Sequence, residues 1–489
     1  MFTQGRSQRG QVLVLVALAI LGLVAMVGLA VDSGAAFTEQ RHSQNAADAA
    51  VLAAALAKVN NQANWQEAAE QILVQNGFSV DQITINHPPS TQDCNPNDGQ
   101  QSPYVGNEEY IQVIVRSSTE PYFGQIVGVE TLSTCVEAVA HARPGSNGAL
   151  FNGMGIVTTK TSGDNTFLLN GSANVRVHNS GIFVNSNSSR GLFLNGGASV
   201  VMDTYGYTVS GSYGKNGGAS VTPGIQQGQP LTINSETFSF IPPIPTPPTC
   251  SANGTQTTSG STITFTPGKF GDITINGGMT AVFQPGVYCL NGNLNLNGSA
   301  TFTSSGRVIF VTQDQNITFN GGTTLNIPDI EIYTRNGTWT LNGSNTFTPN
   351  RIRFYASGSG QWIVNGGSTV KANDAFFYLT KGYITWNGSS NIDLKAPPVG
   401  DPFAGLLVYM PVGNTSNIIF NGGSSIKLTG TYLAPNAPMT VNGSVSLNAI
   451  HSQIVVSSMI VNGGTTLDVT YNANENAGAP VPTSIELVQ

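Results

Sequence analysis

The chain has 489 residues and a formal net charge of −7, and 9% of its residues are charged, against roughly 25% in an ordinary soluble domain. Hydrophobic residues at 40% and aromatic residues at 8% are too many for a disordered chain, which combines low hydrophobicity with high charge. With 19 Lys and Arg against 26 Asp and Glu, the chain lacks the basic excess on which phosphate binding depends, which argues against a nucleic-acid partner. A chain rich in Gly, Asn, Ser, Thr and aliphatic residues is typical of turns and strands.

Residues 12–31 form an apolar run without a charged or polar side chain. At about 1.5 Å per residue the run spans the ~30 Å hydrocarbon core of a bilayer, and it is longer than the ~7–15 apolar residues of a cleaved signal. Arg6 and Arg9 precede it, which favours a cytoplasmic N-terminus. We predict a retained single-pass anchor over residues 1–31, with the rest of the chain outside the cytoplasm at the cell surface. Cleavage near residues 34–36 is the alternative.

A small α+β domain is predicted over residues 32–145. The alanine-rich stretch 44–55 has high helix propensity and is expected to continue the membrane helix outward. The further expected elements are a helix at 65–76, strands at 83–85 and 110–115, a helical turn at 122–127 and a closing strand at 133–142.

The residues around the apolar helix carry a resemblance. The helix end Gly28-Leu29-Ala30-Val31-Asp32 and the tract 44–55 resemble the N-terminus of TadE/TadG-like proteins of Flp/Tad pilus systems. Segments 111–113, 123–126 and 134–140 also fit the extracytoplasmic strand, short helix and strand of these proteins, so the resemblance covers roughly residues 9–142. It implies a membrane-anchored protein whose partners are Tad pilus components or other pilin-like subunits.

One position departs from the related pseudopilins. Those cleaved by prepilin peptidase carry a Glu five residues after the processing Gly, and counting from Gly10 this position is Leu15. The departure favours a stationary TadG-like anchor. A processed filament or tip subunit is the alternative.

The four cysteines are Cys94, Cys135, Cys250 and Cys289. None has CxxC or metal-ligand spacing and the five histidines are scattered, so we expect no zinc site. An exported chain with four isolated cysteines suits two disulfides. Sequence order suggests Cys94–Cys135 and Cys250–Cys289, although three pairings are formally possible.

A short motif recurs beyond Pro144: an apolar residue, then Asn-Gly, then Gly or Ser. Nine of the eleven intervals between its asparagines lie between 20 and 25 residues, which is typical of a solenoid with one coil per repeat. The asparagines are Asn170, Asn195, Asn216, Asn276, Asn297, Asn320, Asn342, Asn365, Asn387, Asn421, Asn442 and Asn462.

Columns read down the repeat predict strands. The residue before the Asn is apolar in every repeat except at Lys215, and the residue five after it is apolar in all. The next column is mixed and polar, so one step moves from core to solvent, as in a strand. We predict a mainly β, parallel β-helix of ~22-residue coils over residues 146–471, right-handed by the usual rule for parallel crossovers. A β-roll or a sandwich is less favoured, because neither needs one fixed turn residue every 22.

Several details follow from stacking successive coils about 4.8 Å apart. Twelve coils make a rod on the order of 60 Å long. Asn-Gly is expected to form the turn, since both residues tolerate positive φ, and inward-pointing asparagine amides would form a ladder. Trp339 and Trp362 occupy the same place in adjacent coils and are expected to stack.

Two insertions and a tail interrupt the pattern. Residues 217–275 include a proline-rich excursion that a Cys250–Cys289 bridge would tie to a coil, and residues 396–405 form the second insertion. Segments 401–409 and 430–437 resemble β-helical C-terminal regions fused to TadG-like anchors in bacteria, a resemblance that covers about residues 265–470. Residues 472–489 are predicted to be a flexible tail.

Enzymatic sites in β-helices need two or three acids close together on adjacent coils. The sparse acids of the rod are not expected to share a column. Lys371, Asp393 and Lys427 do line up, which we interpret as a solvated charged face rather than a carbohydrate site. Asp329 and Glu331 lie on one face and could hold a cation, although a solvated strand edge is favoured. The acids are Asp272, Asp314, Asp329, Glu331, Asp374, Asp393, Asp401 and Asp468.

The sequence therefore predicts a non-enzymatic surface protein of a Tad-type pilus system, with no catalytic, cofactor-binding or metal-binding residues. The rod would support pilus assembly or adhesion through a carbohydrate or protein ligand. The alternatives are a filament or tip subunit and a polysaccharide-active β-helix enzyme.

Overall fold

The computed structural model describes residues 9–60, 62–91, 94, 103–143, 146–481 and 483–488. The chain divides into two units, residues 1–147 with 480–489 and residues 148–479. The sequence placed the start of the solenoid two residues earlier, at 146. The second unit is a parallel β-solenoid, so the predicted fold class of an apolar N-terminal helix followed by ~22-residue coils is confirmed.

Helix α1 (Arg9–Val59) contains the apolar run and the alanine-rich tract in one uninterrupted element. At about 1.5 Å per residue it is roughly 77 Å long. Its N-terminal part is exposed, whereas small side chains of its C-terminal part, such as Ala47, Ala50 and Ala54, are fully buried. The small alanine side chains allow this end of the helix to pack closely on the sheet of the first unit.

That sheet is antiparallel, with the order β1-β2-β3-β43. Apart from η1, which was not expected, the remaining elements match the expected helix, strands and helical turn to within a few residues. They are α2 (Trp65–Gln75), η1 (Val80–Gln82), β1 (Ile83–Asn86), β2 (Tyr110–Thr119), η2 (Gly124–Val127) and β3 (Leu132–Arg143). The Cys94–Cys135 disulfide joins residue 94 to β3, so this predicted pairing is confirmed.

The C-terminal residues form an ordered strand, so the prediction of a flexible tail over residues 472–489 is wrong. Strand β43 (Ser484–Leu487) pairs antiparallel with Ala140–Arg143 of β3. Ile485 packs against the core of the first unit. The pairing with β3 and the contact of Ile485 with the core hold this strand in place, although its local composition does not predict a strand. Two further elements belong to this stretch, η5 (Ala473–Glu475) and β42 (Gly478–Val481), which pairs with β4 (Ser146–Ala149).

The solenoid has three faces, each a ladder of parallel strands. The first face carries the repeated asparagines and comprises β6 (Phe167–Gly171), β9 (Leu192–Gly196), β12 (Gly214–Gly217), β18 (Ile273–Ile275), β21 (Leu294–Leu296), β24 (Ile317–Asn320), β27 (Thr338–Asn342), β30 (Gln361–Val364), β33 (Ile384–Trp386), β36 (Ile418–Gly422), β38 (Met439–Gly443) and β40 (Met459–Gly463).

The second face follows the Asn-Gly turn. It comprises β7 (Asn174–His178), β10 (Ser199–Met202), β13 (Ser220–Thr222), β16 (Thr262–Phe265), β19 (Thr280–Phe283), β22 (Thr301–Thr303), β25 (Thr324–Asn326), β28 (Thr346–Phe347), β31 (Thr369–Ala372), β34 (Asn391–Lys395), β41 (Thr466–Thr470) and the first parts of β37 (Ser425–Ala434) and β39 (Ser446–Val456).

The third face completes each coil. It comprises β5 (Ile156–Thr158), β8 (Ile182–Val184), β11 (Gly206–Thr208), β14 (Ile225–Gln227), β17 (Gly268–Phe270), β20 (Gly286–Leu290), β23 (Arg307–Thr312), β26 (Asp329–Thr334), β29 (Arg351–Ala356), β32 (Asp374–Leu379), β35 (Leu406–Tyr409) and the last parts of β37 and β39. Outside the three faces lie β15 (Gln256–Ser259), η3 (Leu150–Gly153) and η4 (Glu236–Phe238).

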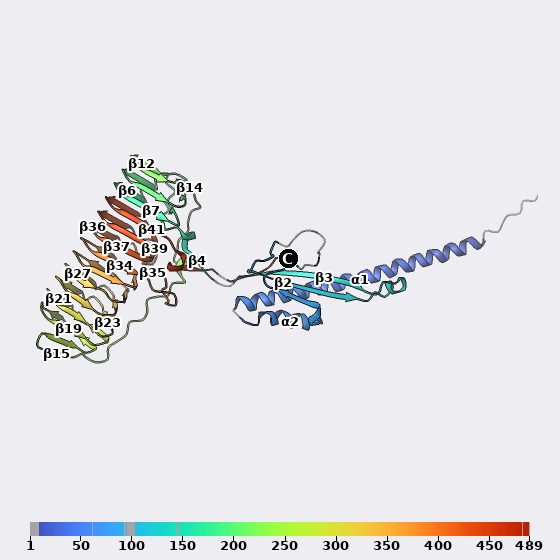
Figure 1. The fold of residues 1–489 in the computed structure, drawn as a ribbon, viewed down its shortest axis with the longest axis horizontal. Helices are drawn as coiled ribbons and strands as arrows, with labels where there is room; N and C mark the ends of the chain where they lie inside the picture. The colour runs from blue at the N-terminus through green and yellow to red at the C-terminus, as the bar shows by residue number, and fades with distance from the viewer. Residues whose placement is uncertain are drawn as a thin grey trace, which may run out of the picture. The chain divides into compact units, whose positions relative to one another are not determined.

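The coils do not stack in chain order. Strand β6 of the Asn170 coil pairs with β40 of the last coil, and β12 and β18 are the two ends of the first face. The chain thus enters in the interior of the stack and winds to the β12 end. It then crosses to the β18 end and winds back until its last coil pairs with its first. The first and last coils therefore lie side by side in Figure 1.

Much of the predicted insertion at 217–275 therefore belongs to turns of the solenoid, and residues 228–255 are its one long segment without a strand. Extended at about 3.1 Å per residue they reach roughly 85 Å, enough to pass eleven coil spacings of ~4.8 Å. On the way, Phe238 and Ile241 are buried in an apolar cluster on the third face. The Cys250–Cys289 disulfide fixes the far end, as the sequence predicted. Residues 396–405, the second predicted insertion, lie between β34 and β35.

Asn and Gly have different conformations in the turn, whereas the sequence led us to expect positive φ at both. The glycine after the asparagine adopts it, for example Gly366 at φ 73°, except in the Asn276 turn, where Gly278 does; none of the repeated asparagines does. The asparagine side chains instead lie at the corner, half-buried except at Asn216 and Asn276, and bond from coil to coil. Asn365 donates from Nδ2 to Oδ1 of Asn342, and Asn387 donates to Asn365, both at 2.8 Å. The predicted ladder is thus present on the first face from Asn276 to Asn170, and a separate bond joins Asn195 and Asn216.

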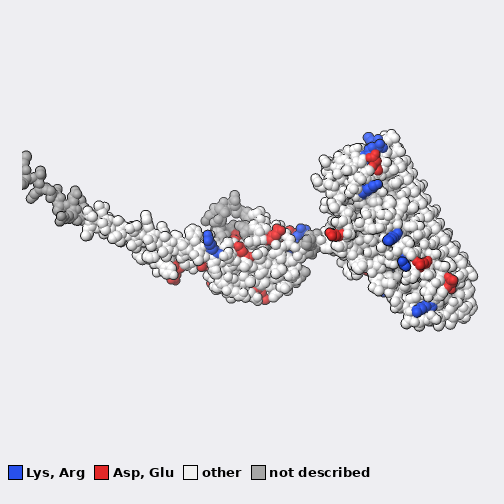
Figure 2. Space-filling model, turned by 180° about the vertical axis from the view of Figure 1, so that it is seen from behind, with Lys and Arg blue, Asp and Glu red and all other residues white. Residues whose placement is uncertain are grey.

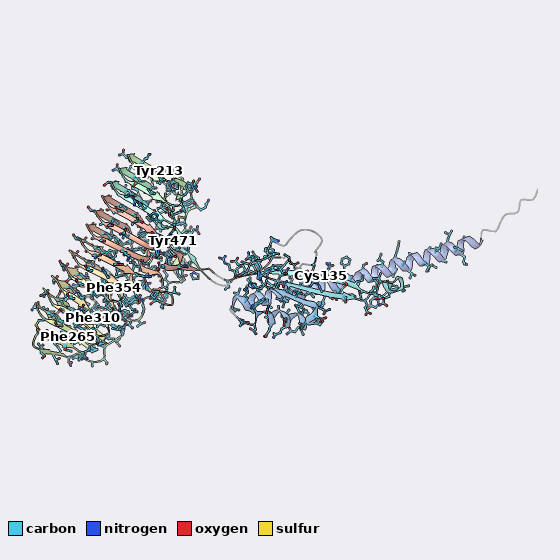
Figure 3. The ribbon with its side chains drawn as sticks, in the orientation of Figure 1. Cys135, Tyr213, Phe265, Phe310, Phe354 and Tyr471 are labelled. Carbon is cyan, nitrogen blue, oxygen red and sulfur yellow. A yellow bond between two sulfur atoms is a disulfide. The ribbon has the colours of Figure 1, made fainter. Side chains whose placement is uncertain are left out.

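The core is built from the apolar columns, and Figure 3 shows Phe265, Phe310 and Phe354 along it. All three side chains are fully buried. Trp339 and Trp362 stack with ring centroids 5.3 Å apart and 8° between their planes, which confirms that prediction. Lys215 is the polar exception, and it lies in β12, the end strand of the first face, where it is exposed.

Candidate functional site

The carboxylate of Asp32 joins α1 to the loop between β2 and β3. Asp32 follows the apolar run directly and is 7% exposed. It accepts hydrogen bonds from the backbone N–H groups of Tyr122 and Gly124, each at 2.7 Å, and of Phe123 at 3.1 and 3.2 Å. Three backbone donors around one carboxylate fix the loop to the helix at the end of its apolar segment.

The apolar part of α1 is exposed in this chain. Among the described residues, Val12–Val59 is the one helix that is long and apolar enough to cross a membrane, with a mean hydropathy of 3.0 in its most apolar window, of which 6% is buried. Figure 2 shows this part of the helix without blue or red side chains. A helix with such a surface is suited to lipid or to apolar partners.

Arg and acidic side chains alternate across four coils of the third face. Register pairs Arg307 with Asp329, Asp329 with Arg351 and Arg351 with Asp374. Arg351 Nη1 lies 3.2 Å from Asp329 Oδ1, and Arg351 Nε lies 3.6 Å from Asp374 Oδ2. The expectation that the acids share no column is therefore wrong, because the coil period places Asp329 and Asp374 in one column with Arg351 between them.

A second, buried row lies beside this column. Glu331 pairs with Arg307 and accepts a hydrogen bond from Tyr333, and its side chain is 5% exposed. Arg353, 1% exposed, lies 2.6 Å from Asp374 Oδ1 and 2.8 Å from Asp401 Oδ2. Asp329 and Glu331 therefore form neither a cation site nor a solvated edge.

The arrangement of these groups is that of an ion-pair network. Three guanidinium groups contact four carboxylates, which keeps buried charge paired, as a low-dielectric interior requires. Within the described residues, no group of three or more His, Cys, Asp or Glu side chains is placed to hold a metal ion.

Neutral polar side chains form a continuous column on the second face, four residues after each asparagine. Register places Thr301 beside Thr324 and Thr324 beside Thr346, and the alternate residues, such as Phe302, point into the core. The column consists of Ser220, Ser199, Asn174, Thr466, Ser446, Ser425, Asn391, Thr369, Thr346, Thr324, Thr301, Thr280 and Thr262. Hydroxyl and amide groups thus repeat along the whole face at the strand spacing.

Lys371, Asp393 and Lys427 lie in register on the same face, as expected. Lys427 Nζ is 3.8 Å from Asp393 Oδ2, and both side chains are largely exposed. This geometry is that of a solvated ion pair.

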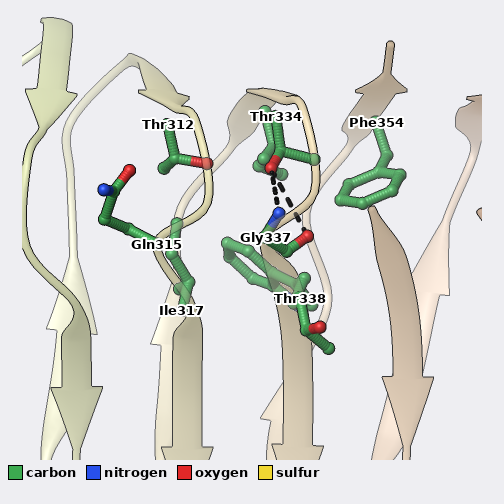
Figure 4. A pocket seen from close by; sticks show the side chains of 9 residues that line it. Thr312, Gln315, Ile317, Thr334, Gly337, Thr338 and Phe354 are labelled. Carbon is green, nitrogen blue, oxygen red and sulfur yellow. Dashed lines mark hydrogen bonds between the residues drawn. The ribbon is translucent and has the colours of Figure 1, made fainter. Parts of the chain in front are cut away.

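A crevice between coils lies beside Trp339 (Figure 4). Thr334 closes it by accepting a hydrogen bond from the N–H of Gly337 at 2.9 Å and donating to its carbonyl at 3.4 Å. The space is too narrow for a water molecule, so it offers no room for a substrate.

Comparison with known families bears on the helix rather than the solenoid. Residues 10–57 match the family model described as "Putative Flp pilus-assembly TadE/G-like". The N-terminal segment is TadE/G-like. The match ends at residue 57, close to the end of α1 at Val59. No curated protein and no solved structure matches the chain.

The TadE/G-like segment supports a role in a Flp/Tad pilus system and association with a membrane. It includes Asp32, the residue that fixes the β2–β3 loop. The position of Asp32 directly after the apolar helix was visible in the sequence, whereas the loop 90 residues later that it binds was not.

The sequence contained a usable signal for the ion-pair network. Arg351 and Arg353 follow Asp329 and Glu331 by one coil of 22 residues. Adding that period to each acid would have placed a guanidinium group beside it.

Proposed function

We propose that this chain is a non-enzymatic, single-pass membrane protein of a Tad-type pilus system. Its N-terminus lies in the cytoplasm, and the β-solenoid is displayed at the cell surface for adhesion. The TadE/G-like segment supports the pilus system and the membrane. The carrying observation for adhesion is the column of neutral Ser, Thr and Asn side chains on the second face.

Neutral carbohydrate is the ligand class that this column suits. Its hydroxyl and amide groups both donate and accept hydrogen bonds. The neighbouring outward column is uncharged in most coils, and its charged members are Arg176, Lys371, Asp393, Lys427 and Asp468. Repetition in every coil allows many weak contacts to act together along an extended polymer, which raises overall binding well above that of one contact.

The ion-pair network of the third face argues against the alternative of a polysaccharide-active enzyme. A glycosidase places two carboxyl groups across a substrate with pKa values driven apart. Here each carboxylate of the third face contacts an arginine, and two of the groups involved, Glu331 and Arg353, are buried. Charge compensation of this kind suits stability rather than proton transfer.

The anchor is tested first, by N-terminal sequencing and fractionation of the native protein. An intact N-terminus in the membrane fraction supports a fixed anchor. A chain that begins at Gln11 in sheared pili would instead make it a filament or tip subunit.

Adhesion is tested with the detergent-solubilised full chain on insoluble neutral polysaccharides such as cellulose and chitin. The variant Thr324→Val with Thr346→Val removes two neighbouring hydroxyls from the second face. Thr318→Val with Thr340→Val is the matched control, because these threonines are neighbours in the same two coils but on the first face. We expect at least a twofold loss of binding only in the first variant. No binding by wild type, or equal loss in both variants, would reject the second face as the binding surface.

A further inference from the structure

The loop between β2 and β3 exposes apolar side chains. Tyr122 is 75% exposed and Ile126 is 81% exposed, with Phe123 and Val129 beside them at 38% and 41%. Three of these are large side chains clustered within five residues around η2. Exposed apolar clusters of this kind mark an interaction surface.

The position of this loop is fixed against the end of the apolar run. Phe123 packs on Gly28, where a Cβ atom would lie 2.8 Å from the phenylalanine side chain, so the close approach requires glycine. Gly28 lies three residues, or about 4.5 Å along the helix axis, inside the end of the run. The loop therefore sits at the depth where the helix would leave the hydrocarbon core.

The backbone of the loop is suited to a lipid environment, in which unpaired N–H groups are costly. Asp32 accepts from the N–H groups of residues 122–124. Those of Ile126, Gly128 and Val129 donate to carbonyls of the loop itself, at 3.0–3.2 Å. The apolar side chains can thus leave water without stranding these donors.

We propose that the loop of residues 121–129 inserts into the headgroup boundary of the bilayer that α1 spans, in the leaflet on the side of the folded domain. Tyr122 would lie at the interface, where aromatic side chains with a polar tip are favoured, and Ile126 and Val129 would reach the acyl chains. This second membrane contact, which rests on the proposed spanning position of α1, fixes the orientation of the first unit against the membrane surface.

The charges at the two ends of the loop indicate which lipids suit it. Glu120 and Glu130 are exposed and flank the apolar side chains. Carboxylates at the headgroup level are repelled by anionic lipids and not by zwitterionic ones. We therefore expect the loop to lie deepest in phosphatidylcholine.

The experiment uses the full chain reconstituted at about one molecule per phosphatidylcholine vesicle. An environment-sensitive fluorophore is attached to Ile126→Cys, and lipids with a spin label on the acyl chain act as quenchers. Val74→Cys is the matched control, an exposed aliphatic residue on α2 of the same unit. Leu21→Cys, in the middle of the apolar run, reports whether α1 is in the bilayer.

We expect strong quenching at residue 21, clear quenching with blue-shifted emission at residue 126, and neither at residue 74. Quenching at residue 21 with a water-like signal at residue 126 would reject the loop insertion while leaving the anchor intact. Blue-shifted emission at residue 126 without quenching would place the loop against other residues of this chain rather than lipid, and would also reject the insertion. Absence of quenching at residue 21 would overturn the anchor itself, and the inference with it.

Discussion

The side chains of Asn170 and Asn462 are hydrogen-bonded, Nδ2 to Oδ1 at 2.8 Å, although 292 residues separate them along the chain. Strands of their coils pair on all three faces, β40 with β6, β41 with β7 and β39 with β5. The same ladder that joins neighbouring repeats thus joins the first coil to the last. Because contacts at such separation require closure of a very long loop, we expect this junction to form late in folding.

A cysteine pair across this junction tests the stacking order. Asn174 and Thr466 are register partners on the second face, and adjacent strands lie within the ~4.4–6.8 Å Cα separation of a disulfide. We expect Asn174→Cys with Thr466→Cys to form a third disulfide, detected by mass spectrometry of the non-reduced protein.

The control pair is Ser446→Cys with Thr466→Cys, which are neighbours in chain order and in the structure. If coils stacked in chain order, residues 174 and 466 would be separated by about 50 Å. A disulfide in the control alone would therefore contradict the order described here.

In the interior coils, the asparagine ladder is expected to stabilise the solenoid through hydrogen bonds to both neighbouring coils. Asn365→Ala removes the bonds to Asn342 and from Asn387. At a net ~0.5–1.5 kcal/mol per hydrogen bond, we expect the free energy of unfolding to fall by about 1–3 kcal/mol in urea titrations.

Asn216→Ala serves as the control, because Asn216 lies in the end coil and donates one bond of 3.2 Å to Asn195. We expect a loss of at most about 1 kcal/mol there. Equal losses of unfolding free energy in the two variants would show that the hydrogen bonds between asparagines do not contribute to stability.

Among the residues of the ion-pair network, we expect substitution of Arg353 to lower the free energy of unfolding most. Arg353→Met leaves Asp374 and Asp401 without their buried guanidinium partner. Removal of one partner from a buried pair typically costs about 3–5 kcal/mol, measured as a shift of the denaturation midpoint. Lys427→Met, which breaks an exposed pair with Asp393, is expected to cost less than about 1 kcal/mol. A small effect at both sites would contradict the network's structural role.

Alkaline pH is expected to weaken the third face through Tyr409. Burial, and then the nearby Tyr378, raise the pKa of Tyr409 to about 12, against an ordinary value of about 10. A raised pKa of a phenol means that its contribution to stability is complete below pH 10 and is lost as pH rises from about 10 to 12.

Thermal denaturation across pH 9–12 measures this loss. We expect Tyr409→Phe to lessen the decline of the midpoint in that window, and Tyr205→Phe, which changes an exposed ring, to leave it as in wild type. If the midpoint of Tyr409→Phe declines as steeply as that of wild type, ionisation of Tyr409 is not the cause of the alkaline destabilisation.

Truncation after residue 482 tests the contribution of β43 to the first unit. The variant loses the partner of residues 140–143 of β3 and the core contact of Ile485. We expect faster amide hydrogen exchange in β3 and unchanged exchange in the Asn320 and Asn342 coils of the solenoid. Unchanged exchange in β3 would show that β43 is dispensable.

Much of the fold follows from local sequence. The alternation of apolar and polar residues after each Asn-Gly determines which side chains enter the core, and the intervals of 20–25 residues determine the coil. The stacking order does not follow, because every coil presents nearly the same edge and no residue of a coil marks which coils are its neighbours. The one indication was residues 228–255, long enough to pass the whole stack. Strand β43 was missed for a related reason, since its order depends on β3, more than 300 residues away.

The candidate sites were less accessible to sequence reasoning. The column of Lys371, Asp393 and Lys427 was found because it lies at a fixed distance from the asparagines. The Arg and acidic side chains of the third face were accessible in the same way, because Asp329, Arg351 and Asp374 each lie nine residues after a repeated asparagine. Asp32 binds backbone N–H groups, which no side-chain pattern reveals.

The chain both enters and leaves the solenoid within the stack, so neither end of the stack is a free terminus. One end is formed by residues 206–227, whose chain continues into the return segment, and the other by residues 256–275, where β15 folds back on β16 as an antiparallel hairpin. Solenoids with a free end can fray there, one coil after another. Here an outermost coil can detach only as a closed loop held at both sides. A protease or a pulling force that acts on the tip therefore finds no strand end from which to start.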